Sequence, residues 1–546
     1  DLHLLSRRQR QMCIRDSSSA KTQWGKKIIA DLEQKVKERR KHSLEVPKEE
    51  GGHFHDYFCP VHNLQFTFRW DKPLAQYCSA CDKEWIGNNR YDWAWIYEVH
   101  MLNRDYMYQC MYLYLATGKR QYADYIRTML LDYAGKYAGW FEHNSGRKAT
   151  DQHSGKAFAQ SLDEANWATK VAMAYMAIKP VLSKEEVKAI EEGYLQPAAT
   201  LLLHRPAGAN WQMWHNSGLA ALGIALENDS IVDVAINKDK YGYHYLIGKH
   251  KNSDGWINEG SPHYHYYPLE ALLFTANAVK CRGIKLFDKD LHDMFVEPVK
   301  GTYPDLSFPA HSDGWYGANL LSQSALYEVG NARYNDPFLK RVLELTYAQK
   351  KRLDPEALLS NQLIKASEES LLQKSYSFDT SGFCLLRSDT RTVVLKFGGE
   401  GIGHGHPDKL SITIHDGKNE LVSDFGTSGY GVPDYLKWYK RTLSHNTVTV
   451  DAKDQKRSVG KLLKFNPRSD GGYAEAETTT AYPGVRMKRS LDLKGTHLQD
   501  VYTCTSDSSH LYEYVILFNE KPLMDGQPTA TTLTGSEVHE RIHNIF

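Results

Sequence analysis

The sequence lacks any run of about 18 consecutive apolar residues, so we expect no segment to cross a membrane as a helix. It also lacks a dominant charge, because 67 Lys and Arg residues face 66 Asp and Glu residues. This balance argues against the broad positive field of a nucleic-acid-binding protein. The beginning lacks the charged and then apolar pattern of a signal peptide. It resembles translated sequencing-adapter read-through, so we treat residues 1–20 as a non-native leader and leave room for a signal peptide lost upstream.

Cysteine is scarce, with eight residues in the chain, and most of them are isolated. The exception is a pattern that pairs Cys59 with His62 and Cys78 with Cys81, each pair separated by two residues. Two such pairs on neighbouring turns are typical of a structural zinc site. A disulfide or redox pair between Cys78 and Cys81 is the alternative in an oxidising compartment.

Aromatic residues are plentiful, with 34 Tyr and 12 Trp among 546 residues. Tyr and Trp stack on sugar faces and hydrogen-bond at their edges, so the composition suits a carbohydrate cleft. Large helical cores use the same residues, and composition alone does not decide between the two. The length predicts two or three domains.

Helical spacing of apolar residues dominates from residue 91 to residue 370. One stripe begins at Met107 and ends at Gly118, a residue typical of a helix C-terminus. The segment Ser183-Lys-Glu-Glu186 is a capping box that opens a later helix. Successive helices with short connections and no fixed repeat favour an α/α toroid over a regular solenoid.

The pattern changes after residue 371, where alternating segments such as GFCLLRS, TVVLKFG and KLSITIH indicate antiparallel strands. We therefore predict an α+β multidomain protein. It has an N-terminal extension with the Cys/His cluster (21–90), an α/α toroid (91–370) and an antiparallel β-sandwich (371–546). No evident closing element precedes Phe546, which leaves open a C-terminal truncation of the sandwich.

Histidines cluster in this β region. His404 and His406 are two residues apart, so in an extended segment both imidazoles project from one face. With Asp424 and His445 from neighbouring strands, they can close a His-His-Asp metal site of the kind that zinc accepts.

Two further motifs lie in the helical region. Asn210 opens the segment NWQMWHN, where we expect it to cap a helix with Trp211 and His215 on one face. The second motif, DGWINEGSPHYHYY, crowds Trp256, Glu259 and Tyr264 around one loop. Packing at an interface is the alternative for most of these aromatic residues.

Together, these two motifs and the segments GHGHPD, SDFGT and SHNTVTVD resemble the heparinase II/III-like polysaccharide lyases, in the order in which that family carries them. The similarity extends from about residue 91 to the end of the chain. It implies a helical toroid followed by a β-sandwich, and β-elimination at a uronic acid that leaves a 4,5-unsaturated uronate. The implied partner is an anionic polysaccharide, with glycosaminoglycans slightly ahead of ulvan and alginate, and the implied location is the periplasm or the exterior.

The resemblance also implies residue roles. Asn210 matches the residue that neutralises the uronate carboxylate; Trp211 stands where many relatives carry His, and His215 could supply that imidazole. Tyr264 and His404 match the base and acid, in either order, and His406, Asp424 and His445 match the ligands of a structural Zn²⁺. Substrate contacts are expected from Trp211, Trp256, Glu259, Tyr430 and Arg441.

Other interpretations remain at this point. His406, Asp408 and His445 also fit the H-x-D…H triad of iron oxygenases, although that leaves Tyr264 without a role. The run GGEGIGHG leads into a strand instead of a helix, which excludes a dinucleotide loop. A glycan-binding protein with an inactive site is the non-enzymatic alternative. The sequence determines neither the polymer, nor endo or exo action, nor the oligomeric state.

Overall fold

The computed structural model describes residues 18–523, apart from 150–152, 370, 372–373, 400–402 and 431. The chain divides into two compact units. The helical unit comprises residues 1–249, 267–292 and 324–367, and the β unit comprises residues 250–266, 293–323 and 368–546. The boundary expected at 370 therefore lies near the end of the helical unit, but two earlier segments belong to the β unit. They do so because they pack and hydrogen-bond within it, as between Asp254 and Ser381 (2.8 Å).

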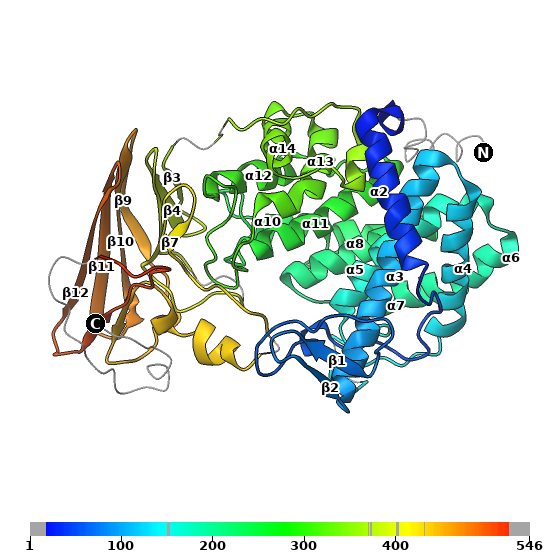
Figure 1. The fold of residues 1–546 in the computed structure, drawn as a ribbon, viewed down its shortest axis with the longest axis horizontal. Helices are drawn as coiled ribbons and strands as arrows, with labels where there is room; N and C mark the ends of the chain where they lie inside the picture. Colours follow the sequence, from blue (N-terminus) through cyan, green and yellow to red (C-terminus); the bar gives the residue numbers. More distant parts are fainter. Residues whose placement is uncertain are drawn as a thin grey trace. The chain divides into compact units, whose positions relative to one another are not determined.

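The helices that lie in the helical unit or reach into it form an array of neighbouring segments (Figure 1). Their bounds are α2 (Gln23–Arg39), α3 (Asn89–Thr117), α4 (Arg120–Tyr137), α5 (Ser161–Ile178), α6 (Lys184–Ile190), α7 (Gln196–Leu203), α8 (Ala209–Ala225), α9 (Asp229–Asn237), α10 (Tyr243–His250), α11 (His263–Val279), α12 (Lys289–Val296), α13 (Ser324–Tyr334) and α14 (Pro337–Gln349). Helix α5 contacts both α3 and α8, so these three are neighbouring helices of the α/α toroid predicted above.

Local sequence signals explain several helix ends. Gly118 caps α3 in the left-handed conformation (φ 67°), where a residue without a Cβ has no steric penalty. Ser183 and Glu186 form both hydrogen bonds of the predicted capping box at α6. One prediction is wrong, because Asn210 is not the cap of α8. The cap residue is Gly208, and Asn210 lies inside the first turn.

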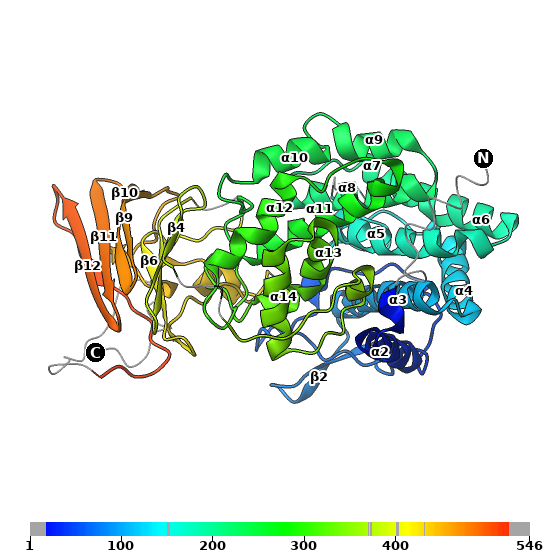
Figure 2. The same ribbon diagram turned by 90° about the horizontal axis from the view of Figure 1, so that it is seen from above.

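The β unit contains two larger antiparallel sheets that face each other (Figures 1 and 2) and a two-stranded sheet of β8 (Val448–Val450) and β13 (Tyr512–Tyr514). The five-stranded sheet has the order β3-β4-β5-β6-β7, with bounds Tyr376–Phe378, Phe383–Arg387, Thr392–Lys396, Ser411–His415 and Glu420–Val422. The four-stranded sheet has the order β12-β11-β10-β9, with bounds His497–Ser506, Val485–Lys494, Gly471–Tyr482 and Lys461–Arg468. Buried residues of both sheets form one core, including Leu395, Ile412, Ala476 and Met487. This packing is the predicted β-sandwich.

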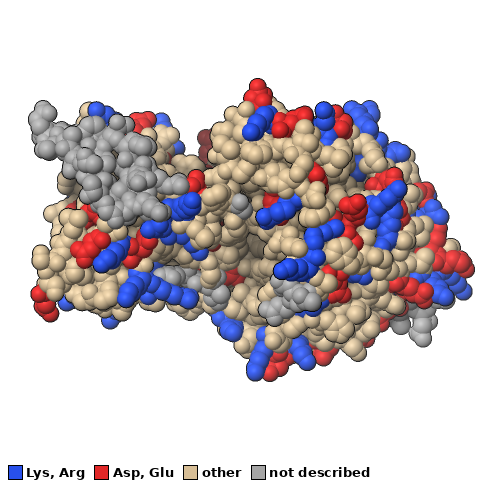
Figure 3. All heavy atoms as spheres, turned by 90° about the horizontal axis from the view of Figure 1, so that it is seen from below, with Lys and Arg blue, Asp and Glu red and all other residues tan. Residues whose placement is uncertain are grey.

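Two expectations from the composition concern the mixture of charges on the surface and the absence of helices that could span a membrane. On the face drawn in Figure 3, Lys and Arg side chains are interspersed with Asp and Glu side chains. None of the helices that the structure describes has the length and apolarity needed to span a membrane.

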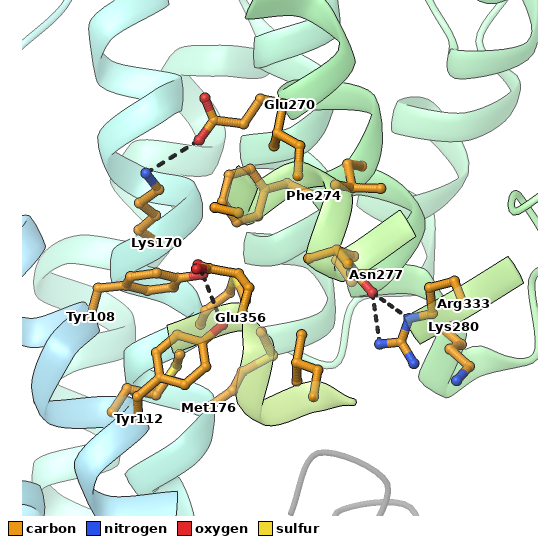
Figure 4. A pocket seen from close by; sticks show the side chains of 18 of the residues that line it. Tyr108, Tyr112, Lys170, Met176, Glu270, Phe274, Asn277, Lys280, Arg333 and Glu356 are labelled. Carbon is orange, nitrogen blue, oxygen red and sulfur yellow. Dashed lines mark hydrogen bonds and ion pairs between the residues drawn. The ribbon is translucent and has the colours of Figure 1, made fainter. Parts of the chain in front are cut away.

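A cavity of about 220 Å³ lies inside the helical unit, between α3, α5, α11 and α13 (Figure 4). Its wall is mostly apolar. Six polar groups of the wall pair with one another: Lys170 with Glu270 (3.4 Å), Tyr108 with Glu356 (3.2 Å), and Arg333 with Asn277 (2.8 Å). Because these polar groups have partners within the wall, we interpret the cavity as a packing feature of the toroid.

Glu356 in this wall should make stability depend on pH. Burial raises the pKa of its carboxyl from 4.5 to about 7, so the folded state keeps a proton that the unfolded chain has lost. The free energy of unfolding should therefore fall as the pH rises from about 4.5 to about 7. Glu356→Gln should remove about 2 kcal/mol of that fall. Urea unfolding at about pH 5 and about pH 8 measures this fall in the free energy of unfolding, with Glu192→Gln at an exposed position as the control. An equal fall in both variants would contradict the prediction.

Candidate active site

Asp313 organises a cluster of ionisable side chains in the β unit. Asp313 is fully buried. The residue before it, Ser312, has a left-handed backbone conformation (φ 57°). The Oδ2 atom of Asp313 lies 2.9 Å from His404 Nδ1, and its Oδ1 atom lies 2.8 Å from His406 Nε2. The Asp313 backbone N–H also donates to the His404 carbonyl (3.0 Å). One carboxylate therefore holds both imidazoles of the predicted pair, although their segment is irregular and not a strand.

Two tyrosines complete the cluster beside His404. The ring of Tyr264, in the first turn of α11, stacks on the imidazole with centroids 3.5 Å apart and 13° between the planes. Its hydroxyl forms a short hydrogen bond with the hydroxyl of Tyr430. The Tyr430 oxygen also lies 3.0 Å from His404 Nδ1 and 3.1 Å from Asp313 Oδ2. Tyr264, Tyr430 and His404, which are far apart in the sequence, thus form one hydrogen-bonded group.

The electrostatics of the cluster favour an ionised carboxylate and neutral phenols. Burial by itself would raise the pKa of Asp313, but hydrogen bonds from His404 and His406 outweigh it and hold that pKa well below its ordinary value. Burial raises the pKa of Tyr264, and the negative charges of Asp313 and Glu259 act in the same direction. Tyr264 therefore carries its proton at neutral pH, which suits a proton donor better than a resting base.

The carboxylate also selects the tautomers of the histidines. An ionised carboxylate only accepts hydrogen bonds, so His404 presents Nδ1–H and His406 presents Nε2–H to Asp313. The remaining nitrogen of His404, Nε2, then has a lone pair and lies 3.6 Å from Glu259 Oε2. That atom can accept a proton, and Glu259 would stabilise the resulting imidazolium.

The predicted metal ligands His406, Asp424 and His445 lie deeper in the same unit. His445 Nδ1 donates to Asp424 Oδ2 (2.9 Å), and Asp424 Oδ1 accepts from the Gly426 N–H (3.0 Å). His406 Nδ1 and His445 Nε2 are both buried without a hydrogen-bond partner among the described residues, and their rings are 5.3 Å apart. Two orphaned nitrogens, each on a ring oriented by a carboxylate, fit a cation such as zinc. Asp424 differs from the prediction, because both its oxygens are engaged and it orients His445.

Several predicted residues are not in this cluster. Trp256 is 4% exposed and belongs to the packing of the β unit, where it contacts the rings of His265, Phe308, Phe378 and Phe383. Arg441 donates to Asp454 (2.6 Å), so its charge is matched by a carboxylate outside the cluster. The sequence did not show that these side chains have partners elsewhere, and the structure does not support their predicted contact with a substrate.

Asn210, Trp211 and His215 lie on α8 in the helical unit. The ring of Trp211 contacts the ring of His153 (4.9 Å) and remains partly exposed. His215 has no exposed surface, and burial lowers its pKa to about 4. A neutral, enclosed imidazole cannot contact a polymer, so the structure does not support the role predicted for His215.

The iron-oxygenase alternative fails at Asp408. This residue is fully buried and forms ion pairs with Lys396 and with Lys409 (2.8 Å to the latter). A carboxylate held between two ammonium groups is not free to act as the metal ligand that the H-x-D…H triad requires.

Sequence reasoning missed Asp313 and Tyr435. The Tyr435 hydroxyl donates to Asp313 Oδ2 (3.0 Å), which adds a further donor to the central carboxylate. Neither residue stands in a recognisable motif. The closest signal was the polar run HSDG at residues 311–314 between apolar segments, which by itself predicts only a turn.

A separate group in the helical unit could hold a metal ion. The ligand atoms of Cys59, His62, Cys78 and Cys81 all lie within 4.8 Å of one another. Among the described residues, this is the one group of three or more Cys, His, Asp or Glu side chains gathered so closely.

Two family models match the chain. "Heparinase II/III-like, C-terminal" matches residues 371–522, and "Alginate lyase" matches residues 99–296. An alginate lyase of Stenotrophomonas maltophilia is 29% identical over 476 residues, which are 78% of this chain and 63% of that protein. An exo-oligoalginate lyase of Saccharophagus degradans is 26% identical over 485 residues, with shares of 78% and 64%. The chain thus spans less than two thirds of the length of these curated relatives.

A comparison with solved structures gives the same type of fold. A solved structure of a heparinase III superposes with a TM-score of 0.59 at 15% identity, covering 93% of this chain and 81% of the other. At that identity the likeness concerns the fold, which is the helical toroid with a β-sandwich described above. The matched regions and their order are those on which the sequence resemblance was based, so the comparisons confirm the resemblance to the heparinase II/III-like polysaccharide lyases.

Proposed function

We propose that the protein is a polysaccharide lyase that cleaves a uronate-containing polymer by β-elimination. The observation that carries the proposal is the cluster of Tyr264, His404 and Tyr430 on the buried carboxylate of Asp313. It places a protonated phenol and an imidazole with an available nitrogen side by side. These are the two groups that an elimination needs, one to take a proton and one to give a proton.

The tautomer of His404 and the protonated state of Tyr264 assign the base role to His404 and the acid role to Tyr264. His404 Nε2 takes the C5 proton of the uronate, and the electrons of that C–H bond form the C4–C5 double bond. The C4–O bond then breaks, and the Tyr264 hydroxyl protonates the leaving oxygen. Glu259, 3.6 Å from Nε2, stabilises the imidazolium that forms. The catalytic groups are then reset by a relay: the imidazolium gives its Nδ1 proton to the Tyr430 oxygen (3.0 Å), and Tyr430 passes its own proton to Tyr264.

The role expected of Asn210, neutralising the uronate carboxylate, stays a prediction, because this residue is buried on α8 in the helical unit. Without a donor on that carboxylate the C5 proton is too weakly acidic for imidazole to remove. An amide side chain supplies two N–H donors and no charge, which suits a carboxylate ligand.

A Zn²⁺ ion in the β unit would be held by His406 Nδ1 and His445 Nε2, while Asp424 orients His445 through the hydrogen bond from its Nδ1. These nitrogens are the buried atoms without partners described above. The ion would fix the wall of the β unit that carries His404. The protein's own part is to orient the two rings through Asp313 and Asp424.

Among the polymers, alginate now comes first, ahead of the glycosaminoglycans favoured by the sequence alone. The two relatives described above are named for alginate and oligoalginate. The interspersed charges of Figure 3 also suit a uronate polymer without sulfate better than a densely sulfated one. Such polymers occur outside the cytoplasm, so the proposed place of action is the periplasm or the exterior.

Ultraviolet absorbance of the conjugated 4,5-unsaturated uronate tests the proposal. The panel contains alginate, heparin, heparan sulfate, chondroitin sulfate, hyaluronan and ulvan. We expect absorbance to rise with alginate. A rise with a sulfated polymer alone would keep the elimination and overturn the choice of substrate. Binding to a polymer with no rise on any of the six would favour the inactive glycan-binding alternative.

A further inference from the structure

We propose that Cys59, His62, Cys78 and Cys81 form a structural zinc site that holds residues 53–86 in place on helix α3. The site lies in the helical unit, and the proposal does not depend on the reaction proposed above. Zinc prefers four thiolate and imidazole ligands in a closed tetrahedron when its role is structural.

Each ligand pair comes from one tight turn. The first turn, Cys59-Pro-Val-His62, is closed by hydrogen bonds of the Cys59 N–H to Leu64 (2.8 Å) and of the Asn63 N–H to Cys59 (3.0 Å). The second is the connection between strands β1 (Ala75–Cys78) and β2 (Lys83–Ile86), which pair antiparallel with Cys78 opposite Lys83. A bridge between Thr67 and Tyr77 joins the two parts, so both turns face the same point.

The distances between the ligand atoms fit a zinc tetrahedron. With Zn–S of about 2.3 Å and Zn–N of about 2.0 Å, sulfur and nitrogen ligands should lie about 3.5–3.8 Å apart. Cys59 Sγ lies 3.5 Å from Cys81 Sγ and 3.9 Å from His62 Nδ1. Cys78 Sγ lies 3.8 Å from the same nitrogen, which is 3.0 Å from Cys81 Sγ. In the structure the cysteines are free thiols.

The four-ligand arrangement separates this proposal from a redox pair. Cys59 and Cys78 have no exposed surface, Cys81 is partly exposed and His62 is exposed. The convergence of all four ligand atoms, His62 included, would be unexplained by a Cys78–Cys81 disulfide. The Cys81 N–H points at Cys78 Sγ (3.5 Å), a contact that would help stabilise a thiolate there.

The segment needs such a link because its own core is small. The buried cluster beneath it consists of Tyr57, Cys59, Phe66, Cys78 and Ala94, so two of the five side chains are the thiols themselves. Ala94 belongs to the first turns of α3, and Tyr91 and Trp95 of the same helix pack against the cluster. A hairpin and a turn of this size gain much of their stability from a metal when one is present.

Cobalt substitution tests the site in the full-length chain. The reduced, metal-free protein is loaded with Co²⁺, and the near-ultraviolet charge-transfer absorbance from thiolate to cobalt is recorded. A cation bound by His406 and His445 gives no such band, so the readout is specific to cysteine ligands. We expect the band in the wild type, its displacement by Zn²⁺, and its loss in Cys78→Ser. Cys281→Ser, at a partly buried thiol elsewhere in the helical unit, should keep it.

A second measurement uses the wild-type protein, so its result does not depend on whether a variant folds. Hydrogen exchange of residues 53–86 in the wild type should be markedly faster in the metal-free protein than with Zn²⁺ bound. His62→Ala should weaken zinc affinity by more than about 100-fold, since even an outer partner of a ligand contributes about 10- to 100-fold. The proposal is overturned if the wild type shows no thiolate band, if Cys78→Ser keeps it, or if the isolated protein carries a Cys78–Cys81 disulfide.

Discussion

Tyr264→Phe is expected to lower kcat by about 10³-fold and to leave KM almost unchanged. The substitution removes the hydroxyl that protonates the leaving oxygen and keeps the ring. The stacking on His404, with centroids 3.5 Å apart, therefore remains, and Tyr430 keeps its contact with Asp313. The variant should fold normally, so the loss would report on chemistry.

Steady-state kinetics on the polymer identified by the absorbance panel measure this effect. Tyr316→Phe is the matched control, because Tyr316 is a 60% exposed tyrosine of the same unit outside the cluster. The control should keep full turnover. Unchanged turnover in Tyr264→Phe would remove this hydroxyl from the mechanism and leave Tyr430 as the candidate donor.

Asp313→Asn should be the second most damaging change, although Asp313 need not touch the substrate. An amide has the shape of the carboxylate but only one acceptor oxygen, so it cannot accept from both His404 and His406. One histidine then loses its fixed tautomer. We expect kcat to fall by about 10²- to 10³-fold, since an imidazole in the wrong tautomer presents N–H where a lone pair is needed.

The same substitution should also reduce stability by about 2 kcal/mol, because hydrogen bonds to a buried charged group are lost. Nitrogen-15 NMR of the imidazoles separates positioning from a general loss of structure. In the wild type His404 should show the Nδ1–H tautomer, and in Asp313→Asn this preference should weaken while the remaining signals persist. Asp507→Asn, at an exposed position, is the control. A wild-type tautomer and wild-type kcat in Asp313→Asn would refute the positioning role.

Local patterns in the sequence determined the secondary-structure elements. The alternation in KLSITIH gives β6, the glycine after a helical stripe gives the end of α3, and the capping box gives the start of α6. These features depend on neighbours in the chain, and such interactions can be inferred from spacing alone. The two-residue spacing of His404 and His406 predicted two imidazoles on one face of a strand; their segment is irregular, and both rings instead contact Asp313.

Only the tertiary structure decided what those side chains contact. Asp313 is 91 residues from His404 in the sequence and stands in no motif, yet it orients both histidines. Trp256 looked like a sugar-stacking residue and is a buried packing residue, because Phe378 and Phe383 arrive from more than 100 positions later. Burial and partners at long range set the pKa of a carboxyl and the exposure of a ring. Both depend on how distant segments pack, which residue spacing along the chain does not specify.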